Sequence, residues 1–145
     1  METKDAYHST VEENPDLKDI QFISENLSRD AENLTGLKKD FRKIGFFVRD
    51  HDGGITGGLV ADIAWGWLYI WTIWLKEKIR GKGYGRQLFE MAEEEAKKRG
   101  CRNAYLETFN FQARTFYEKL DYEVYSTLED IPKGYRRFLM KKKLE

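Results

Sequence analysis

The sequence is poor in the features that mark several specialised protein classes. It has 1 Cys and 2 Pro among 145 residues. A lone cysteine, Cys101, cannot close an internal disulfide, which excludes a small disulfide-stapled fold. No apolar run approaches the roughly 18 to 20 residues needed to cross a bilayer, and the N-terminus has no apolar signal-peptide segment. We therefore expect a cytoplasmic protein with no membrane partner.

The chain also lacks net charge, because 25 Lys and Arg balance 25 Asp and Glu. A strongly basic domain is typical of nucleic-acid binding, so we expect no nucleic-acid partner. The balance conceals an asymmetry between the halves. Residues 1–70 carry 8 basic and 13 acidic side chains (8 − 13 = −5), and residues 71–145 carry 17 and 12 (17 − 12 = +5). An anionic ligand is expected at the C-terminal half.

Apolar residues make up 41% of the chain, enough for the core of one globular domain spanning residues 1–145. The near-continuous β-branched and aromatic run at 67–75 predicts a central strand covered on both faces. The helix after it should turn Leu88, Phe89, Met91, Ala92 and Ala96 inward and end at Gly100. The other expected strands are 5–12, 44–50, 54–64, 102–109, 122–128 and 135–144, and the other expected helices run from Asn14 and Pro15 to about 34, over 35–43 and over 111–120.

The most informative stretch lies between the central strand and the following helix. Residues 78–86 read KIRGKGYGR and combine three glycines with four cations. A helix N-terminus exposes unpaired N–H groups and a partial positive charge, so a strand, a glycine loop and a helix in this order typically form a phosphate site. The rival interpretation is a plain strand-to-helix turn. The P-loop pattern is absent, and Arg86 stands where a dinucleotide fingerprint needs its third glycine.

Two motifs together resemble the GNAT superfamily of acyl-CoA-dependent N-acyltransferases. The first is Arg80-x-x-Gly83-x-Gly85, which is similar to the loop that cradles the coenzyme A pyrophosphate in that superfamily. The second begins twenty-five residues later, where NFQARTFYEKLDY supplies Asn110, Ala113 and Tyr117 at the spacing of the superfamily's second signature. The resemblance covers about residues 43–143. Glu77 departs from a proline that is common before the loop, and Asp121 stands where glycine is usual.

The resemblance implies a fold, an activity and a set of site residues. The fold would be the α+β GNAT fold, a central mixed sheet of about seven strands flanked by about four helices. Acetyl-CoA would be the cosubstrate, with no metal, and the acceptor would be a primary amine, more plausibly of a small molecule than of a peptide. A homodimer through exposed strands is also an expectation. The implied coenzyme-binding residues are Trp74, Leu75, Arg80, Gly81, Lys82, Gly83, Tyr84, Gly85, Arg86, Asn110 and Tyr117.

Amine acetylation requires three catalytic groups: a base for the amine, a hydrogen-bond donor for the oxyanion and an acid for the thiolate. An alkylamine has a pKa around 10, so a base or a water chain must remove its proton before attack. Glu107 is the first candidate, and Asp62 and Glu77 are the others. A backbone N–H near Leu75 would stabilise the developing oxyanion. Tyr117, in the family's pattern, would protonate the departing thiolate, although a buried aromatic with a satisfied hydroxyl is the alternative interpretation.

Two other functions stay open. The chain could bind coenzyme A as a sensor without turnover, which the presence of Tyr117 disfavours. It could instead acetylate a protein or an aminoacyl-tRNA amine. A large basic surface would be expected for the tRNA substrate, and the zero net charge argues against one.

Overall fold

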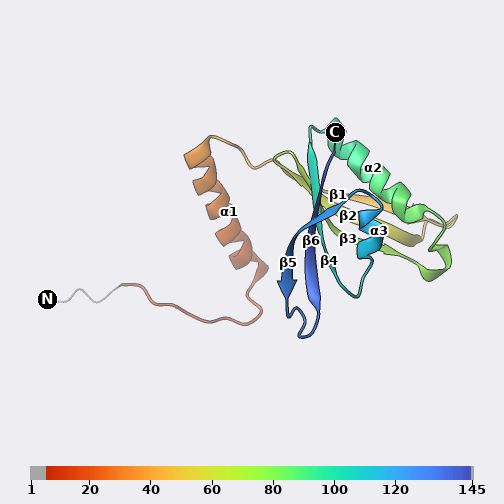
Figure 1. Ribbon diagram of the computed structural model, residues 1–145. Helices are drawn as coiled ribbons and strands as arrows, with labels where there is room; N and C mark the ends of the chain where they lie inside the picture. Colours follow the sequence, from red (N-terminus) through yellow and green to blue (C-terminus); the bar gives the residue numbers. More distant parts are fainter. Residues whose placement is uncertain (1–5, 145) are drawn as a thin grey trace. The chain divides into compact units, whose positions relative to one another are not determined.

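A computed structural model describes residues 6–144 of the chain, and these form two compact units that divide between Lys39 and Asp40 (Figure 1). The first unit contains helix α1 (Leu17–Thr35), which buries none of its residues. Its N-cap is Asp16, whose carboxylate accepts the Lys18 N–H at 2.9 Å. The predicted start at Asn14 and Pro15 was therefore early, because Asn14 has a φ of 50°, outside the extended backbone of an N-cap residue, and Asp16 supplies the capping oxygen instead.

Two elements predicted near the N-terminus do not form. Residues 6–12 have no strand structure, and Asp5 lies outside the described residues. A lone strand needs a ladder partner, and none pairs with this segment. The helix predicted over 35–43 is also wrong: residues 36–40 are irregular, and Phe41 already pairs with Ala64 of a neighbouring strand. Strand pairing has overridden the local helical pattern.

The second unit is built around a mixed six-stranded sheet with the strand order β1-β2-β3-β4-β6-β5. Only β3 and β4 run parallel, and the other neighbours are antiparallel. The described residues thus give six strands and three α-helices, slightly fewer than the seven and four expected. The strands are β1 (Phe41–Arg49), β2 (Ile55–Ala64), β3 (Trp67–Leu75), β4 (Asn103–Phe109), β5 (Glu123–Glu129) and β6 (Arg136–Lys143).

Helix α2 (Tyr84–Lys98) lies across one face of this sheet, and the short helix α3 (Arg114–Glu118) packs into the same core (Figure 1). Phe89 of α2 is fully buried and contacts the rings of Phe116, Tyr117 and Tyr122 at centroid distances of 5.7 to 5.9 Å. Apolar side chains of β2, β3, β4 and β6 complete the core. The core therefore ties α3 to α2.

The predicted inward face of α2 was wrong at one position. Met91 is 45% exposed, whereas Glu93 is buried. At 100° per residue, Met91 points well away from the direction shared by Leu88 and Phe89, and Glu93 lies nearer to it. The prediction for β3 also needs a correction: it is central, but Trp67 and Trp71 are 37% and 48% exposed. Its side chains are covered on the α2 face and open on the other.

Glu93 is held in the core by two partners. Its carboxylate accepts the Tyr122 hydroxyl at 3.3 Å, and the Lys142 ammonium lies 2.8 Å from its Oε1. Burial, together with the Glu93 charge, strongly raises the pKa of Tyr122, so this phenol keeps its proton. The cluster joins α2 to the β5 and β6 side of the sheet.

We expect Glu93→Gln to destabilise the fold by about 1–3 kcal/mol, because it removes a charged hydrogen-bond partner and leaves the Lys142 ammonium half-buried and uncompensated. Urea unfolding would measure the change. Glu94→Gln is the matched control, since Glu94 is exposed one position along the same helix, and a surface change of this kind stays within about 0.5 kcal/mol. Equal stability of the two variants would contradict a stabilising role for the cluster.

Candidate active site

The site begins where β3 parts from β4. The two strands pair only from Trp67 with Asn103 to Ile70 with Leu106, although β3 continues to Leu75 and β4 to Phe109. The parting coincides with a β-bulge. Val60 of β2 opposes Thr72 and Ala61 opposes Ile70, so Trp71 has no partner of its own. A bulge bends a strand and increases its twist, which opens a wedge between the strand ends.

The backbone of β3 beyond the bulge is exposed on the wedge side. The Lys76 N–H donates to the Thr56 carbonyl at 2.8 Å. This bond shows which residues of β3 direct their N–H and C=O groups toward β2. In an antiparallel ladder the intervening residues direct their N–H and C=O groups away from the partner. The groups of Ile73 and Leu75 therefore face the side that β4 has left. The Leu75 carbonyl is already engaged by Arg80 Nε at 2.8 Å.

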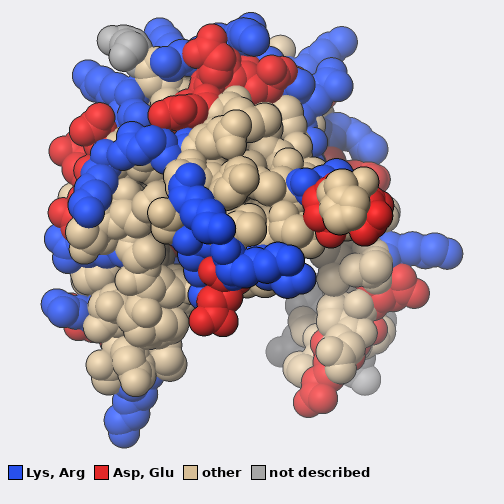
Figure 2. All heavy atoms as spheres, turned by 90° about the vertical axis from the view of Figure 1, so that its right-hand side faces the viewer, with Lys and Arg blue, Asp and Glu red and all other residues tan. Residues whose placement is uncertain are grey.

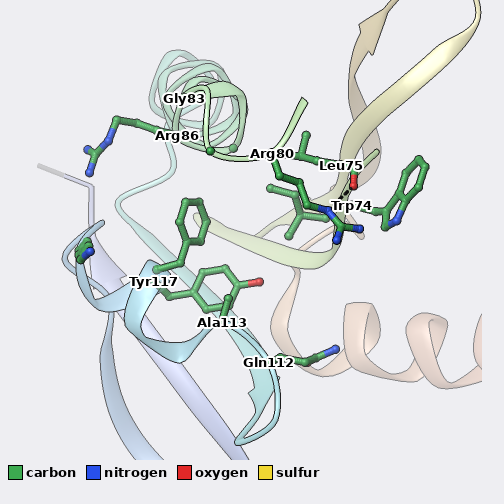
Figure 3. Close-up of a pocket in the computed structure, with 13 residues that line it drawn as sticks. Trp74, Leu75, Arg80, Gly83, Arg86, Gln112, Ala113 and Tyr117 are labelled. Carbon is green, nitrogen blue, oxygen red and sulfur yellow. Dashed lines mark hydrogen bonds between the residues drawn. The ribbon is translucent and has the colours of Figure 1, made fainter. Parts of the chain in front are cut away.

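A cavity of about 750 Å³ occupies this wedge (Figure 3). Three segments line it: the end of β3, the glycine loop with the start of α2, and α3 with the turn before it. The lining residues are Ile73, Trp74, Leu75, Arg80, Gly81, Gly83, Gly85, Arg86, Gln112, Ala113, Phe116, Tyr117 and Lys119.

The glycine loop forms one wall because its backbone adopts conformations that favour glycine. Gly83 is the N-cap of α2 with φ of 90°, and Gly81 has φ of 73°. The free N–H groups of the first helical turn therefore open beside Gly83, with no side chain in the way. Gly85 serves a different purpose. A Cβ there would lie 3.0 Å from the Phe116 ring, so glycine lets α2 and α3 approach closely.

Three cations, Arg80, Arg86 and Lys119, line the cavity. Arg86 lies beside Gly83, whereas Arg80 lies toward Trp74 and Leu75 (Figure 3). Figure 2 looks onto the α2 side of the molecule and shows long Lys and Arg side chains around and across the uncharged surface at its centre. The helix N-terminus, with the Arg86 guanidinium beside it, favours a polyanionic group at this wall.

Tyr117 presents the one phenol among the lining residues. Its hydroxyl points into the cavity, on the side where Trp74, Leu75 and Arg80 lie (Figure 3). No described residue hydrogen-bonds this hydroxyl. Burial raises the pKa of Tyr117 above its usual range, so the group remains a proton donor at neutral pH.

The predicted site residues divide into two groups. Eight line the cavity: Trp74, Leu75, Arg80, Gly81, Gly83, Gly85, Arg86 and Tyr117. Lys82, Tyr84, Asn110 and Glu107 are not among the lining residues. The sequence reasoning missed Phe116 and Lys119. Both are close to Tyr117 in sequence, since Phe116 lies in α3 and Lys119 is the C-cap of this helix.

Asn110 and Glu107 are both engaged by β6. The Asn110 side-chain Oδ1 accepts the Arg136 N–H at 3.0 Å, while its amide nitrogen has no partner among the described residues. Glu107 forms an ion pair with Arg137 on the sheet face opposite α2. Both residues therefore lie at the β4 side of the wedge, where β4 meets β6.

The two alternative carboxylates lie elsewhere. Asp62 of β2 pairs with the Lys43 ammonium at 3.2 Å, and the same ammonium lies 4.1 Å from the centre of the Trp71 ring. Glu77 begins the short 3₁₀ helix Glu77–Ile79 and is exposed. No cluster of three or more His, Cys, Asp or Glu side chains arranged for a metal occurs among the described residues. Residues 6–144 also contain no helix with the length and apolar character to span a membrane.

Comparison with known proteins decides the family. The model of the acetyltransferase (GNAT) family matches residues 7–122. The chain belongs to this family. The likeness extends to curated proteins: acetyltransferase Atu2258 of Agrobacterium fabrum is 37% identical over 113 residues, which are 78% of this chain and 78% of that protein. Blasticidin-S acetyltransferase of Streptomyces morookaense is 36% identical over 93 residues, 63% of this chain and 68% of that protein.

Solved structures confirm the fold of this GNAT protein. The crystal structure of an acetyltransferase from Bacillus cereus ATCC 14579 matches with a TM-score of 0.79 and 30% sequence identity, covering 92% of this chain and 97% of that chain. The α+β GNAT fold predicted from the two motifs is therefore confirmed, and the protein is an N-acetyltransferase.

Proposed function

We propose that this protein transfers an acetyl group from acetyl-CoA to a primary amine of a small molecule by direct attack of the amine on the thioester. The observation that carries the proposal is the Tyr117 hydroxyl, which no described residue hydrogen-bonds and which points into the cavity that the cationic glycine loop also lines. Blasticidin-S acetyltransferase, one of the relatives, is named for a small molecule, which supports a small acceptor over a macromolecule.

The residues present suit the coenzyme of this family. The N–H groups of the loop from Arg80 to Arg86 would bind the pyrophosphate, with the side chains of Arg86 and Lys119 beside them. The Leu75 N–H, turned toward the wedge, would bind the pantetheine arm as an added strand does. Asn110 keeps its amide nitrogen as a donor for the same arm while its oxygen holds β6. When bound, acetyl-CoA supplies an acyl group activated as a thioester.

The protein's part in the reaction is to move two protons and to stabilise one charge. The backbone N–H groups that face the wedge stabilise negative charge on the thioester oxygen. Tyr117 gives its proton to the departing sulfur, and its raised pKa keeps that proton in place until it is needed. Glu107 removes the proton of the incoming amine, directly or through water, from the open face of the sheet.

Loss of the Tyr117 proton should slow the reaction without weakening coenzyme binding. We expect Tyr117→Phe to lower kcat by about 100-fold or more, and to leave the KM for acetyl-CoA nearly unchanged, in a thiol-release assay. Tyr125→Phe is the control. Tyr125 is 47% exposed on β5, so this substitution removes a phenol that lies away from the cavity. A variant that changed only KM would show that Tyr117 serves binding rather than proton transfer.

The role of Glu107 is tested by the pH dependence of its loss. Glu107→Gln should lower kcat/KM most near pH 7, and the defect should shrink toward pH 9.5, because more of the amine is then already neutral. Asp62→Asn, on the same open face, is the control and should behave as the parent protein. A defect of equal size at every pH would mean that Glu107 only holds Arg137.

The glycine loop is tested with two glycines of similar backbone. Gly83 and Gly53 have φ of 90° and 81°, and no atom lies within 4 Å of a Cβ built at either one. Each alanine substitution should cost roughly 1–2 kcal/mol of stability from left-handed backbone strain. Only Gly83→Ala should also reduce the thermal stabilisation by coenzyme A, which at 100 times the dissociation constant is about 2.7 kcal/mol. Equal stabilisation of both variants would mean that the loop is a plain turn.

A further inference from the structure

Three aromatic side chains form a cluster beside the cavity. The proposed mechanism gives this cluster no role. Phe109 and Phe111 stack with ring centres 5.0 Å apart, and Tyr135 meets Phe111 edge-on at 5.1 Å. Phe111 is 55% exposed and Tyr135 46% exposed. Adjacent exposed aromatic rings are costly in water and typically mark a binding surface. We call these three residues the aromatic platform.

The platform is continuous with the cavity. Phe111 directly precedes Gln112, a lining residue, and Gln112 Oε1 accepts the Phe109 N–H at 3.1 Å. Figure 3 places Gln112 at the end of the cavity away from Gly83 and Arg86. The platform therefore borders the end that is remote from the phosphate-binding wall. That position suits the acceptor rather than the nucleotide part of the coenzyme.

The platform is braced rather than loose. Asn110, between the two phenylalanines, donates its N–H to the Arg136 carbonyl and accepts the Arg136 N–H, both at 3.0 Å. Tyr135 N–H donates to the Pro132 carbonyl at 2.8 Å. The turn after β4 and the turn before β6 are thus locked together. A preorganised surface loses little conformational entropy when a ligand stacks on it.

The charges around the platform are balanced and do not select a polycation. Arg137 lies over Phe109, 5.4 Å from the ring centre, and is paired with Glu107. Arg136 next to Tyr135 forms no ion pair with a described residue. Glu129 stands directly opposite Arg136 in the β5–β6 ladder, so the charges beside the rings balance. An acceptor with several ammonium groups finds no surplus negative charge here, whereas a flat uncharged ring needs none.

We infer that the aromatic platform binds a planar, weakly polar group of the acceptor, so that the substrate class is an amine joined by a short linker to an aromatic or heteroaromatic ring. The inference rests on the proposed function. It assigns Phe111 and Tyr135 as the residues that select the acceptor, and Asn110 as the residue that positions them.

The test compares 2-phenylethylamine with 2-cyclohexylethylamine, which is of similar size but not planar, and with spermidine. The parent protein should prefer the phenyl compound. Phe111→Leu keeps an apolar side chain but loses the ring, and should raise the KM for 2-phenylethylamine about 2- to 12-fold. Its kcat and its KM for acetyl-CoA should stay unchanged. Tyr125→Leu, an exposed aromatic change on β5, is the control and should leave every constant unchanged.

Calorimetric binding of 2-phenylethylamine to the protein loaded with coenzyme A gives a readout that does not depend on turnover. Weaker binding to Phe111→Leu than to the parent supports the platform. Binding of equal strength to both proteins, no binding to either, or a preference for spermidine overturns the inference. A raised KM for acetyl-CoA would assign the platform to the coenzyme and overturns it as well. Thiol release with any other amine would still uphold the proposed function, so the two failures are distinguishable.

Discussion

The separation of β3 from β4 is the constraint on which the site depends. Two parallel strands that stayed paired to their ends would use their own N–H and C=O groups on each other and leave no room between them. The extra residue at Trp71 turns β3 away, which opens the space for the cavity and leaves the Leu75 backbone facing it. The sheet therefore has a free backbone edge at the cost of hydrogen bonds between β3 and β4.

The wedge also divides the chemistry between two sides of the sheet. The cationic loop and Tyr117 reach it from the side of α2 and α3, while the Glu107 carboxylate lies on the open face. A thioester held in the wedge would be reached by a proton donor from one side and by an amine from the other. In the proposed mechanism, such a division would keep the leaving sulfur and the attacking nitrogen from competing for the same space.

Much of this arrangement could be predicted from sequence because the signals were local. The glycine loop, the apolar run at 67–75 and the spacing from Asn110 to Tyr117 are each patterns of a few residues. The strand β3 and the start of α2 lie where these patterns predict them, and Tyr117 lines the cavity. The prediction for Met91 was wrong although helix periodicity already turns it away from the face of Leu88 and Phe89. The burial of Glu93 could not be predicted, because helix periodicity does not say which polar residue will find a buried partner across the sheet. Glu93 finds Tyr122 and Lys142, which are 29 and 49 residues away. The bulge, too, depends on the register between two strands, which neither strand's sequence displays alone.

The two glycines of the loop are required for different physical reasons, which affects how such sequences diverge. Gly83 is free of neighbours and is required by its backbone angle, whereas Gly85 is required by the ring of Phe116 on another helix. The two glycines of this one motif should therefore tolerate substitution differently during evolution. An exchange at position 83 has no compensating partner, but a larger residue at 85 becomes tolerable when 116 becomes smaller. A pattern search that demands both glycines would overlook relatives in which that paired replacement has taken place.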